Sequence, residues 1–375
     1  MSSRFSSPTF HLSLYFIGFF LCWPLRAADQ RDLDPPPAKS IAAANPAEFQ
    51  QGADPQSANA KSSANDSDPL FPVVENRKWG YMDKTGKIVI APKYYNASRF
   101  TEGIARVEPF AVIGAKAIRV QFIDKSGTVL PNSEIYSYAE PFSEGMALVV
   151  VGGERNYAYI DTTGKRVIEQ DQVAGSFREG LAAVGNGHKS GYIDKTGQTV
   201  IPLQFDSNQS FREGLAPVKV GEKWGFVDKT GKMTVSAQYE MAIPYYEGLA
   251  SVKLGGKWGY IDKGGRMVIP PQFTEAFGFC DGLASVKLDR KWGYIDKGGR
   301  LVIPAQYEMA NKHSDGLAGV KLAGKWGFVD TNGHIVVAPQ FDEVGTLSEG
   351  LIEVRVGGKW GYIDKTGKYI WTPTK

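Results

Sequence analysis

Residues 250–270 read Ala-Ser-Val-Lys-Leu-Gly-Gly-Lys-Trp-Gly-Tyr-Ile-Asp-Lys-Gly-Gly-Arg-Met-Val-Ile-Pro and contain three strand-like pieces separated by two glycine pairs. Short connections that carry glycine are typical of β-hairpins. Side chains alternate along a strand, so Trp258 and Tyr260 point to one face of the central piece, and Gly259 and Ile261 to the other. Because both faces carry apolar residues, this small sheet is predicted to be covered on both sides.

The central piece recurs along the chain. Trp-Gly followed by an aromatic residue, and then by Asp, occurs at Trp79, Trp224, Trp258, Trp292, Trp326 and Trp360, with a constant period of 34 residues from Trp224 onward. Three weaker copies, at 120–124, 157–161 and 190–194, fill the interval after Trp79. A fixed period of this length is the signature of a repeat architecture. The sequence therefore predicts nine units over residues 70–375.

Each unit is predicted to be a three-stranded antiparallel β-meander, so the fold class is all-β. Such a unit does not bury its own apolar faces, and neighbouring units must stack against it. Two architectures satisfy this requirement: a propeller-like ring and an open β-solenoid. The array begins with a first strand at 71–75 and ends with a third strand at 369–371. No unit is split between the termini, as it is in many propellers, and this keeps the solenoid open as an alternative.

The N-terminus resembles an export signal. An apolar run from Leu12 to Trp23 is too short for a membrane span, which needs about 20 residues, and Pro24 ends it before Ala27-Ala28. We predict a signal peptide at 1–28 and a disordered linker, rich in Pro, Ala, Ser and Asn, at 29–69. An uncleaved membrane anchor and a lipoprotein signal at Cys22 are the alternatives. The expected location is periplasmic or extracellular, without a stable membrane span after cleavage.

The charge and the cysteine content exclude several classes of function. The chain has 43 basic and 40 acidic residues, a net charge of +3, which gives no reason to expect nucleic acid as a partner. After signal removal Cys280 is the only cysteine, so no internal disulfide is expected. The sequence carries no phosphate-binding loop, serine-nucleophile elbow or zinc-ligand spacing, and we expect neither a cofactor nor a metal.

The repeated phrase resembles the WG-repeat family, also called KWG repeats. The resemblance rests on Trp-Gly, the following aromatic residue and Asp, the glycine of the turn and the later Glu-Gly-Leu-Ala phrase. It implies a bacterial, β-rich repeat protein, often found outside the cytoplasm, and it brings no catalytic residues. Units two to four depart from the pattern, with Val120, Tyr157 and Ser190 in the place of Trp.

Two acidic residues recur in the units. The first ends the central strand: Asp83, Asp124, Asp161, Asp194, Asp228, Asp262, Asp296, Asp330 and Asp364. We interpret it as a turn residue that accepts backbone N–H bonds, rather than as a calcium ligand. The second precedes glycine: Glu102, Glu144, Glu179, Glu213, Glu247, Asp281, Asp315 and Glu349. Glycoside hydrolysis needs one asymmetric pair of carboxyl groups, so a residue repeated in equivalent environments favours a structural role.

The tryptophans and a set of glutamines are the remaining candidates. Trp79, Trp224, Trp258, Trp292, Trp326 and Trp360 are predicted to form the repeat core, with an exposed platform for sugars as the alternative. Gln-aromatic pairs recur in the links between units, where recognition residues commonly lie. The predicted contact face is therefore Gln204-Phe205, Gln238-Tyr239, Gln272-Phe273, Gln306-Tyr307 and Gln340-Phe341.

These observations favour a non-catalytic, extracytoplasmic interaction scaffold that binds protein or glycan through its loops. The alternatives are an envelope glycan-acting enzyme that uses loop carboxylates, and a structural spacer. The sequence leaves the ligand and the oligomeric state open.

Overall fold

The computed structural model describes residues 68–109, 119–152, 156–345 and 347–374. The predicted signal peptide, and the predicted linker up to residue 67, lie outside the described residues. Within the described residues the secondary structure consists of β-strands, and no helix long and apolar enough for membrane passage is found there.

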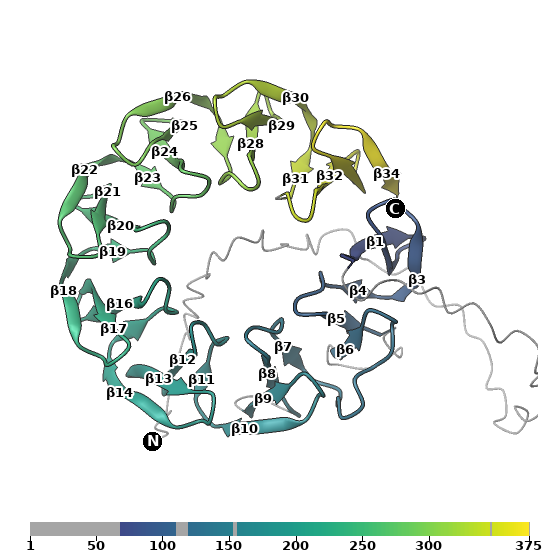
Figure 1. Ribbon diagram of the computed structural model, residues 1–375, viewed down its shortest axis with the longest axis horizontal. Coiled ribbons are helices and arrows are strands. Elements are labelled where there is room, and N and C mark those ends of the chain that lie inside the picture. The colour runs from purple at the N-terminus through teal and green to yellow at the C-terminus, as the bar shows by residue number, and fades with distance from the viewer. Residues whose placement is uncertain (1–67, 110–118, 153–155, 346, 375) are drawn as a thin grey trace, which may run out of the picture. The chain divides into compact units, whose positions relative to one another are not determined.

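The described strands form nine small antiparallel sheets arranged as a ring, which makes the fold a nine-bladed β-propeller (Figure 1). Blade 1 is β1 (Phe71–Glu75), β2 (Lys78–Met82) and β3 (Ile88–Tyr94). Blade 2 is β4 (Asn96–Ala97), β5 (Ile104–Glu108) and β6 (Gln121–Asp124). Blade 3 is β7 (Tyr138–Ala139), β8 (Met146–Val150), β9 (Tyr157–Asp161) and β10 (Arg166–Gln170).

Blades 4 to 9 repeat the four-stranded pattern. Blade 4 is β11 (Val173–Ala174), β12 (Leu181–Gly185), β13 (Ser190–Asp194) and β14 (Thr199–Phe205), and blade 5 is β15 (Ser207–Asn208), β16 (Leu215–Val220), β17 (Lys223–Asp228) and β18 (Met233–Tyr239). Blade 6 is β19 (Met241–Ala242), β20 (Leu249–Leu254), β21 (Lys257–Asp262) and β22 (Met267–Phe273). Blade 7 is β23 (Glu275–Ala276), β24 (Ala284–Leu288), β25 (Lys291–Ile295) and β26 (Leu301–Tyr307). Blade 8 is β27 (Met309–Ala310), β28 (Leu317–Leu322), β29 (Lys325–Asp330) and β30 (Ile335–Phe341), and blade 9 is β31 (Glu343–Val344), β32 (Leu351–Val356), β33 (Lys359–Asp364) and β34 (Tyr369–Thr374).

The predicted unit of three strands is incomplete for seven of the nine blades. A two-residue strand, such as β19 or β23, pairs with the second strand of its blade on the side facing the centre of the ring (Figure 1). Its residues lie in the stretch that the sequence analysis assigned to an irregular link. Two residues carry no periodicity of their own, so only the neighbouring sheet defines this strand.

The outermost strand is also longer than predicted. In blade 6 it continues past Pro270 to Phe273, and the register with β21 steps from Tyr260↔Ile269 to Trp258↔Phe273. Gly259 lies at this irregularity, where a Cβ atom would be 2.5 Å from the carbonyl oxygen of Ile269. The outer strand is an edge, so its prolines need no N–H partner. The backbone of the outer strand thus lies directly against the glycine that follows Trp258.

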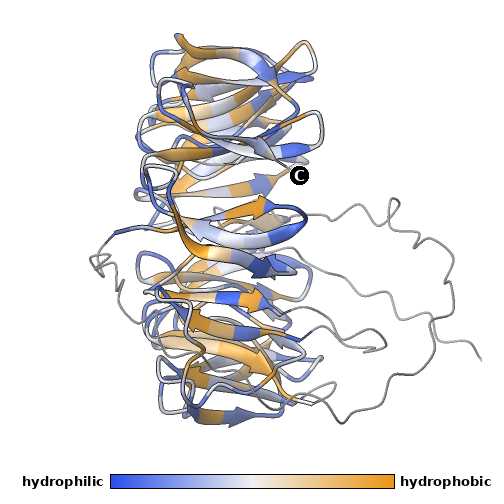
Figure 2. Cartoon of the chain, turned by 90° about the vertical axis from the view of Figure 1, so that its right-hand side faces the viewer, coloured by the Kyte–Doolittle hydropathy of each residue, from blue (hydrophilic) through white to orange (hydrophobic). Residues whose placement is uncertain are grey.

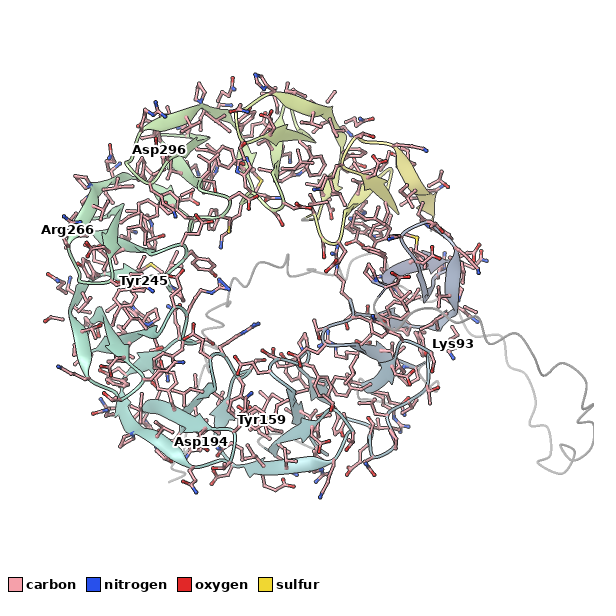
Figure 3. All side chains as sticks on the ribbon, viewed as in Figure 1. Lys93, Tyr159, Asp194, Tyr245, Arg266 and Asp296 are labelled. Atoms are coloured by element: carbon pink, nitrogen blue, oxygen red, sulfur yellow. The ribbon has the colours of Figure 1, made fainter. Side chains whose placement is uncertain are left out.

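Hydrophobic residues fill the spaces within and between the blades. In the edge-on view, apolar residues follow the strands and polar residues occupy many of the turns (Figure 2). Tyr159 and Tyr245 are fully buried within the ring wall, whereas Lys93 and Arg266 are exposed at its outer rim (Figure 3). Tyrosines of the third strands join successive blades: the Tyr260 hydroxyl donates to the Phe277 carbonyl oxygen at 2.8 Å.

The ring closes between blade 9 and blade 1. Tyr362 is 2% exposed, its hydroxyl donates to the Pro72 carbonyl oxygen at 2.8 Å, and its ring lies 5.8 Å from that of Phe71. Phe71, Val73, Met82 and Leu351 form a core cluster with it. The ring was the first of the two predicted architectures, and it is confirmed in place of the open solenoid. Closure needs no split blade, because side-chain packing joins the first and last sheets.

Candidate functional site

The strand-end aspartates form turns, as predicted. In each of the nine units Oδ1 accepts backbone N–H bonds from the residues two and four positions later; for Asp83 these donors are Thr85, at 2.8 Å, and Lys87, at 3.1 Å. Hydrogen bonds from the Thr163 side chain and backbone hold the pKa of Asp161 below its ordinary value. Because the carboxylate accepts hydrogen bonds within the turn, we assign these aspartates a structural role rather than a role in ligand binding.

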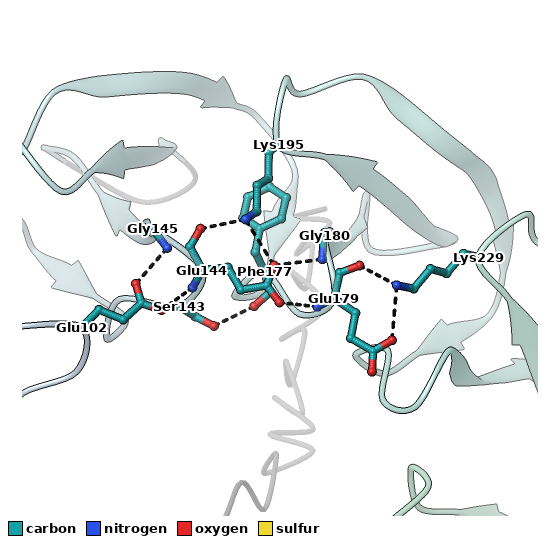
Figure 4. Close-up of polar contacts among 9 residues, drawn as sticks. All are labelled: Glu102, Ser143, Glu144, Gly145, Phe177, Glu179, Gly180, Lys195 and Lys229. Atoms are coloured by element: carbon teal, nitrogen blue, oxygen red, sulfur yellow. Dashed lines mark hydrogen bonds and ion pairs between the residues drawn. The ribbon is translucent and has the colours of Figure 1, made fainter.

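The second acid joins neighbouring blades. Glu144 accepts N–H bonds from Glu179 and from Gly180, the latter at 2.9 Å, and both donors belong to the next blade (Figure 4). The Lys195 ammonium of that blade lies 3.4 Å from the same carboxylate. Equivalent bonds run from Gly145 to Glu102, Gly214 to Glu179, Gly248 to Glu213, Gly282 to Glu247 and Gly316 to Asp281. We call these contacts the blade clamps.

The clamps use an unusual backbone conformation. All eight acids have φ between 52° and 57°, and each is followed by a glycine that also has positive φ. Positive φ at both central positions defines the tight hairpin turn, in which Asn or Asp is the usual first residue. Glutamate at most of these positions supplies a side chain long enough to reach the next blade.

The closing junction lacks a glycine clamp donor. The residue that corresponds to Gly180 in blade 1 is Pro69, which has no N–H group. The preceding Asp68 occupies the place of the second acid, and its carbonyl oxygen accepts from Lys125 Nζ at 3.0 Å, as that of Glu144 does from Lys195 at 2.8 Å. Sequence analysis missed Asp68 because proline replaces the diagnostic glycine after it.

Acid is expected to weaken the clamps. Partial burial raises the pKa of Glu144, but N–H bonds from Gly180 and Glu179 and the Lys195 ammonium outweigh it, so that the pKa lies below the ordinary 4.5. A carboxyl whose pKa is lower in the folded state stabilises the protein above pH 4.5 and loses that contribution as the pH falls further. Glu144→Gln should therefore lower the free energy of unfolding by about 1 kcal/mol near pH 7, and by progressively less below pH 4.

Denaturant titrations at several pH values would measure this effect. Glu349→Gln is the matched control, because proline occupies the place of its clamp donor. Equal, pH-independent losses from the two substitutions would contradict the clamp interpretation.

His313 is a histidine buried among the aromatic residues of the core. His313 takes the place held by Phe279 in blade 7, is 2% exposed, and its Nδ1 has no hydrogen-bond partner. Burial lowers its pKa below 6.5, although the Asp330 carbonyl oxygen and the Asp281 carboxylate act in the opposite direction. It therefore lies in the core.

His313→Phe is expected to raise the free energy of unfolding by about 1 to 2 kcal/mol, because it removes a buried polar atom without a partner. The gain should grow below pH 6.5, where the unfolded histidine binds a proton more readily than the folded one. Thermal melts across this pH range would test it. The reciprocal change, Phe279→His, should lower the free energy of unfolding. A lower free energy of unfolding in both variants would refute the argument.

The glutamine and aromatic residues of the predicted contact face differ in their exposure to solvent. The aromatic members Phe205, Tyr239, Phe273, Tyr307 and Phe341 are 1 to 5% exposed, and they end the outer strands instead of lying in irregular links. The glutamines Gln204, Gln238, Gln272, Gln306 and Gln340 are exposed. Only the amide half of each pair is therefore accessible, and it lies at the end of an outer strand.

The repeated tryptophans lie mainly in the core. Trp224, Trp258, Trp292 and Trp326 are 6 to 9% exposed, and Trp79 and Trp360 are partly buried. A sugar needs an open ring face, and the four buried indoles do not offer one.

The chemically varied positions lie on another part of the molecule. In blades 2 to 9 a loop joins the short first strand to the second strand, as residues 243–248 do in blade 6, and these inner loops point toward the ring centre (Figure 1). The residue just before the second acid varies among the blades, with five residue types at eight positions: Thr101, Ser143, Arg178, Arg212, Tyr246, Cys280, Ser314 and Ser348. That variation beside a constant acid was the signal that sequence analysis did not use.

Comparison with known proteins agrees with the repeat pattern. The model of the WG containing repeat matches residues 79–108, 122–154, 191–224, 224–258, 258–292, 292–326 and 326–360. The chain belongs to the WG-repeat family. These matches cover more than half of this WG-repeat protein. The family model leaves residues 157–190 unmatched, where the structure has strands of blades 3 and 4, and also residues 361–374, where it has the end of blade 9.

Solved structures resemble this WG-repeat protein in fold alone. A crystal structure of the eukaryotic initiation factor is 12% identical, with a TM-score of 0.56, over 80% of this chain and 95% of the other. Apo AztD from Citrobacter koseri has 12% identity and a TM-score of 0.38 over 72% and 93% of the two chains. Hsv2 from Kluyveromyces lactis has 9% identity and a TM-score of 0.40 over 62% and 95%. None of the curated protein sequences compared with the chain matches it.

Proposed function

We propose that this WG-repeat protein is a non-catalytic interaction scaffold that works outside the cytoplasm and binds a protein or glycan partner through its inner loops. The observation that supports the proposal is that the repeated residues and the variable residues take different places in the structure. The repeated Asp, Glu, Gly and Trp residues are engaged in turns, clamps and core, whereas the variable residues lie on loops that face the ring centre.

The geometry of the acids supports binding over hydrolysis. A glycosidase holds two carboxyl groups about 5 to 9.5 Å apart in unequal environments. Here the clamp acids from Glu144 to Glu247 each accept a backbone N–H bond and contact a lysine of the next blade. Such carboxylates are neutralised and held in place by the fold.

The full-length protein, purified after export, is the reagent for the test. It would be immobilised at micromolar concentration, probed on a glycan array and cross-linked to extracytoplasmic proteins, and the specific partner would be purified and titrated. Saturable binding that survives Glu179→Gln and Glu213→Gln supports the scaffold. Empty results in both screens, or turnover of a bound glycan abolished by one such acid-to-amide change, would reject it.

Export has its own test. Mass spectrometry of the mature N-terminus should find cleavage close to Ala28, and recovery of an intact Met1 would reject the cleaved signal peptide.

A further inference from the structure

Basic residues from two blades lie on the inner loops against the ring of one tyrosine. Tyr246 of blade 6 is 9% exposed. The guanidinium carbon of Arg212, from blade 5, lies 4.1 Å from the centre of its ring, and Lys312 Nζ, from blade 8, lies 4.4 Å from it. Arg178 holds the position equivalent to Arg212 in blade 4. We call Arg212, Tyr246 and Lys312 the inner-rim cluster.

A glycine makes the cluster possible. Gly278 of blade 7 separates Tyr246 from blade 8, and a Cβ atom at Gly278 would lie 2.5 Å from Cδ2 of Tyr246. The corresponding inner-loop residues are Pro244 in blade 6 and Lys312 in blade 8. Only a residue without a side chain lets the tyrosine lie across blade 7 and reach the lysine. Contacts that skip a blade form where the blades converge, on the side of the ring centre, toward which inner-rim side chains extend (Figure 3).

The charges of the cluster have no acidic partner in the described part of the chain. Arg212 and Lys312 form no ion pair there. The neighbouring acids Glu179, Glu213 and Glu247 are bound instead to Lys229, Lys263 and Lys297, at 3.4, 3.2 and 3.1 Å. Asp281 lacks such a lysine, because Thr331 replaces it, but its carboxylate accepts the Gly316 N–H at 2.8 Å. Two cations are thus held together over one ring while the local acids serve the clamps.

We propose that the inner-rim cluster binds the carboxylates of an extended, acidic peptide segment. The inference rests on the scaffold function proposed above and names its ligand class. Since the two cations lie 4.1 and 4.4 Å from one ring centre, their charges are at most about 8.5 Å apart. Alternate side chains of an extended peptide are about 7 Å apart on one face, so the carboxylates of acidic residues at every second position fall within this upper limit. Arginine pairs with carboxylate through two parallel hydrogen bonds.

The same geometry disfavours a sugar. A sugar ring stacks on an exposed aromatic face, but Gly278 and the two cations cover Tyr246. The ligand therefore meets charges first, and the tyrosine acts as a support that positions them.

Fluorescence anisotropy with a labelled Ser-Asp-Ser-Asp-Ser-Asp-Ser peptide and the full-length protein would test the proposal. The wild-type protein should bind it, and the peptide with Asn for Asp should bind at least about tenfold more weakly. Arg212→Gln and Lys312→Gln should each weaken binding about tenfold, the range expected for a charged hydrogen bond. Lys93→Gln is the matched control, since Lys93 lies over the Tyr94 ring at 5.2 Å but at the outer rim, and it should leave affinity unchanged.

Several outcomes would overturn the proposal. One is that the Asn peptide binds as tightly as the Asp peptide, and another is that Lys93→Gln weakens binding as much as the two cluster substitutions do. A third is that inorganic phosphate competes as effectively as unlabelled peptide. The last is that a sulfated glycosaminoglycan binds more tightly than the peptide and depends on the same two residues. A partner found in the scaffold screen that binds Arg212→Gln and Lys312→Gln normally would refute the acidic-peptide site alone. Absence of any partner would instead refute the scaffold.

Discussion

Tyr362→Ala is expected to open the ring and to lower the free energy of unfolding by about 4 kcal/mol. Truncating a buried aromatic side chain to alanine typically costs 3 to 5 kcal/mol. At this position the change also removes the hydroxyl bond to the Pro72 carbonyl oxygen and the ring contact with Phe71, which join the last blade to the first. The clamp does not replace them, because Pro69 donates no N–H.

The separation of spin labels across the junction would measure opening. Labels at Lys87 and Thr372, both exposed, suit this purpose, because the adjacent Gly86 approaches the Ile370 carbonyl oxygen. The native cysteines Cys22 and Cys280 would be replaced by serine. A short distance is expected in the parent protein, and a long or broad distribution in Tyr362→Ala.

Tyr260→Ala is the matched control. It removes an equally buried tyrosine inside the array, where the chain itself still connects the blades, so stability should fall while the label distance stays short. Tyr362→Phe keeps the packing and should lose only about 1 kcal/mol. A label distance in Tyr362→Ala that matches the parent, with the protein still folded, would show that other contacts suffice for closure.

Gly259→Ala is expected to lower the free energy of unfolding by about 3 kcal/mol. The new Cβ would meet backbone atoms, 2.5 Å from the Ile269 carbonyl oxygen and 2.8 Å from the Pro271 nitrogen, and a backbone has little freedom to move away. The φ angle of Gly259 is not positive, so the effect is steric and not conformational.

Denaturant midpoints of matched variants would test this. Gly264→Ala is the control: its φ is also not positive, and its Cβ would lie 3.4 Å from Asp262 Oδ1, close to an ordinary contact. It should change stability by less than about 1 kcal/mol. A similar loss in both variants would indicate that glycine flexibility, and not the close approach, is what this position requires.

Part of the candidate site could be predicted from sequence and part could not. The role of Asp83 and its equivalents depends on donors two and four residues away, so local spacing was sufficient. Glu144 was correctly assigned a structural role, but its donors lie in the next blade, 35 and 36 residues along the chain, and their identity required coordinates. Gln272-Phe273 was placed in an irregular link because Pro270 and Pro271 interrupt the pattern, whereas the structure continues the outer strand through both.

The sequence by itself determined the repeating unit: its hairpins, its aspartate turns, the glycine that follows tryptophan and the number of blades. These features depend on contacts within a few residues or on a fixed period, which composition and spacing report directly. The tertiary structure alone decided the short inner strands, the clamps between blades, the closure at Tyr362 and the gathering of Arg212, Tyr246 and Lys312. The short strands depend on pairing within a blade, and the clamps depend on contact with the next blade. Closure and the gathering of the three side chains depend on how the rotations between successive blades accumulate, and this curvature brings together residues that no local pattern connects.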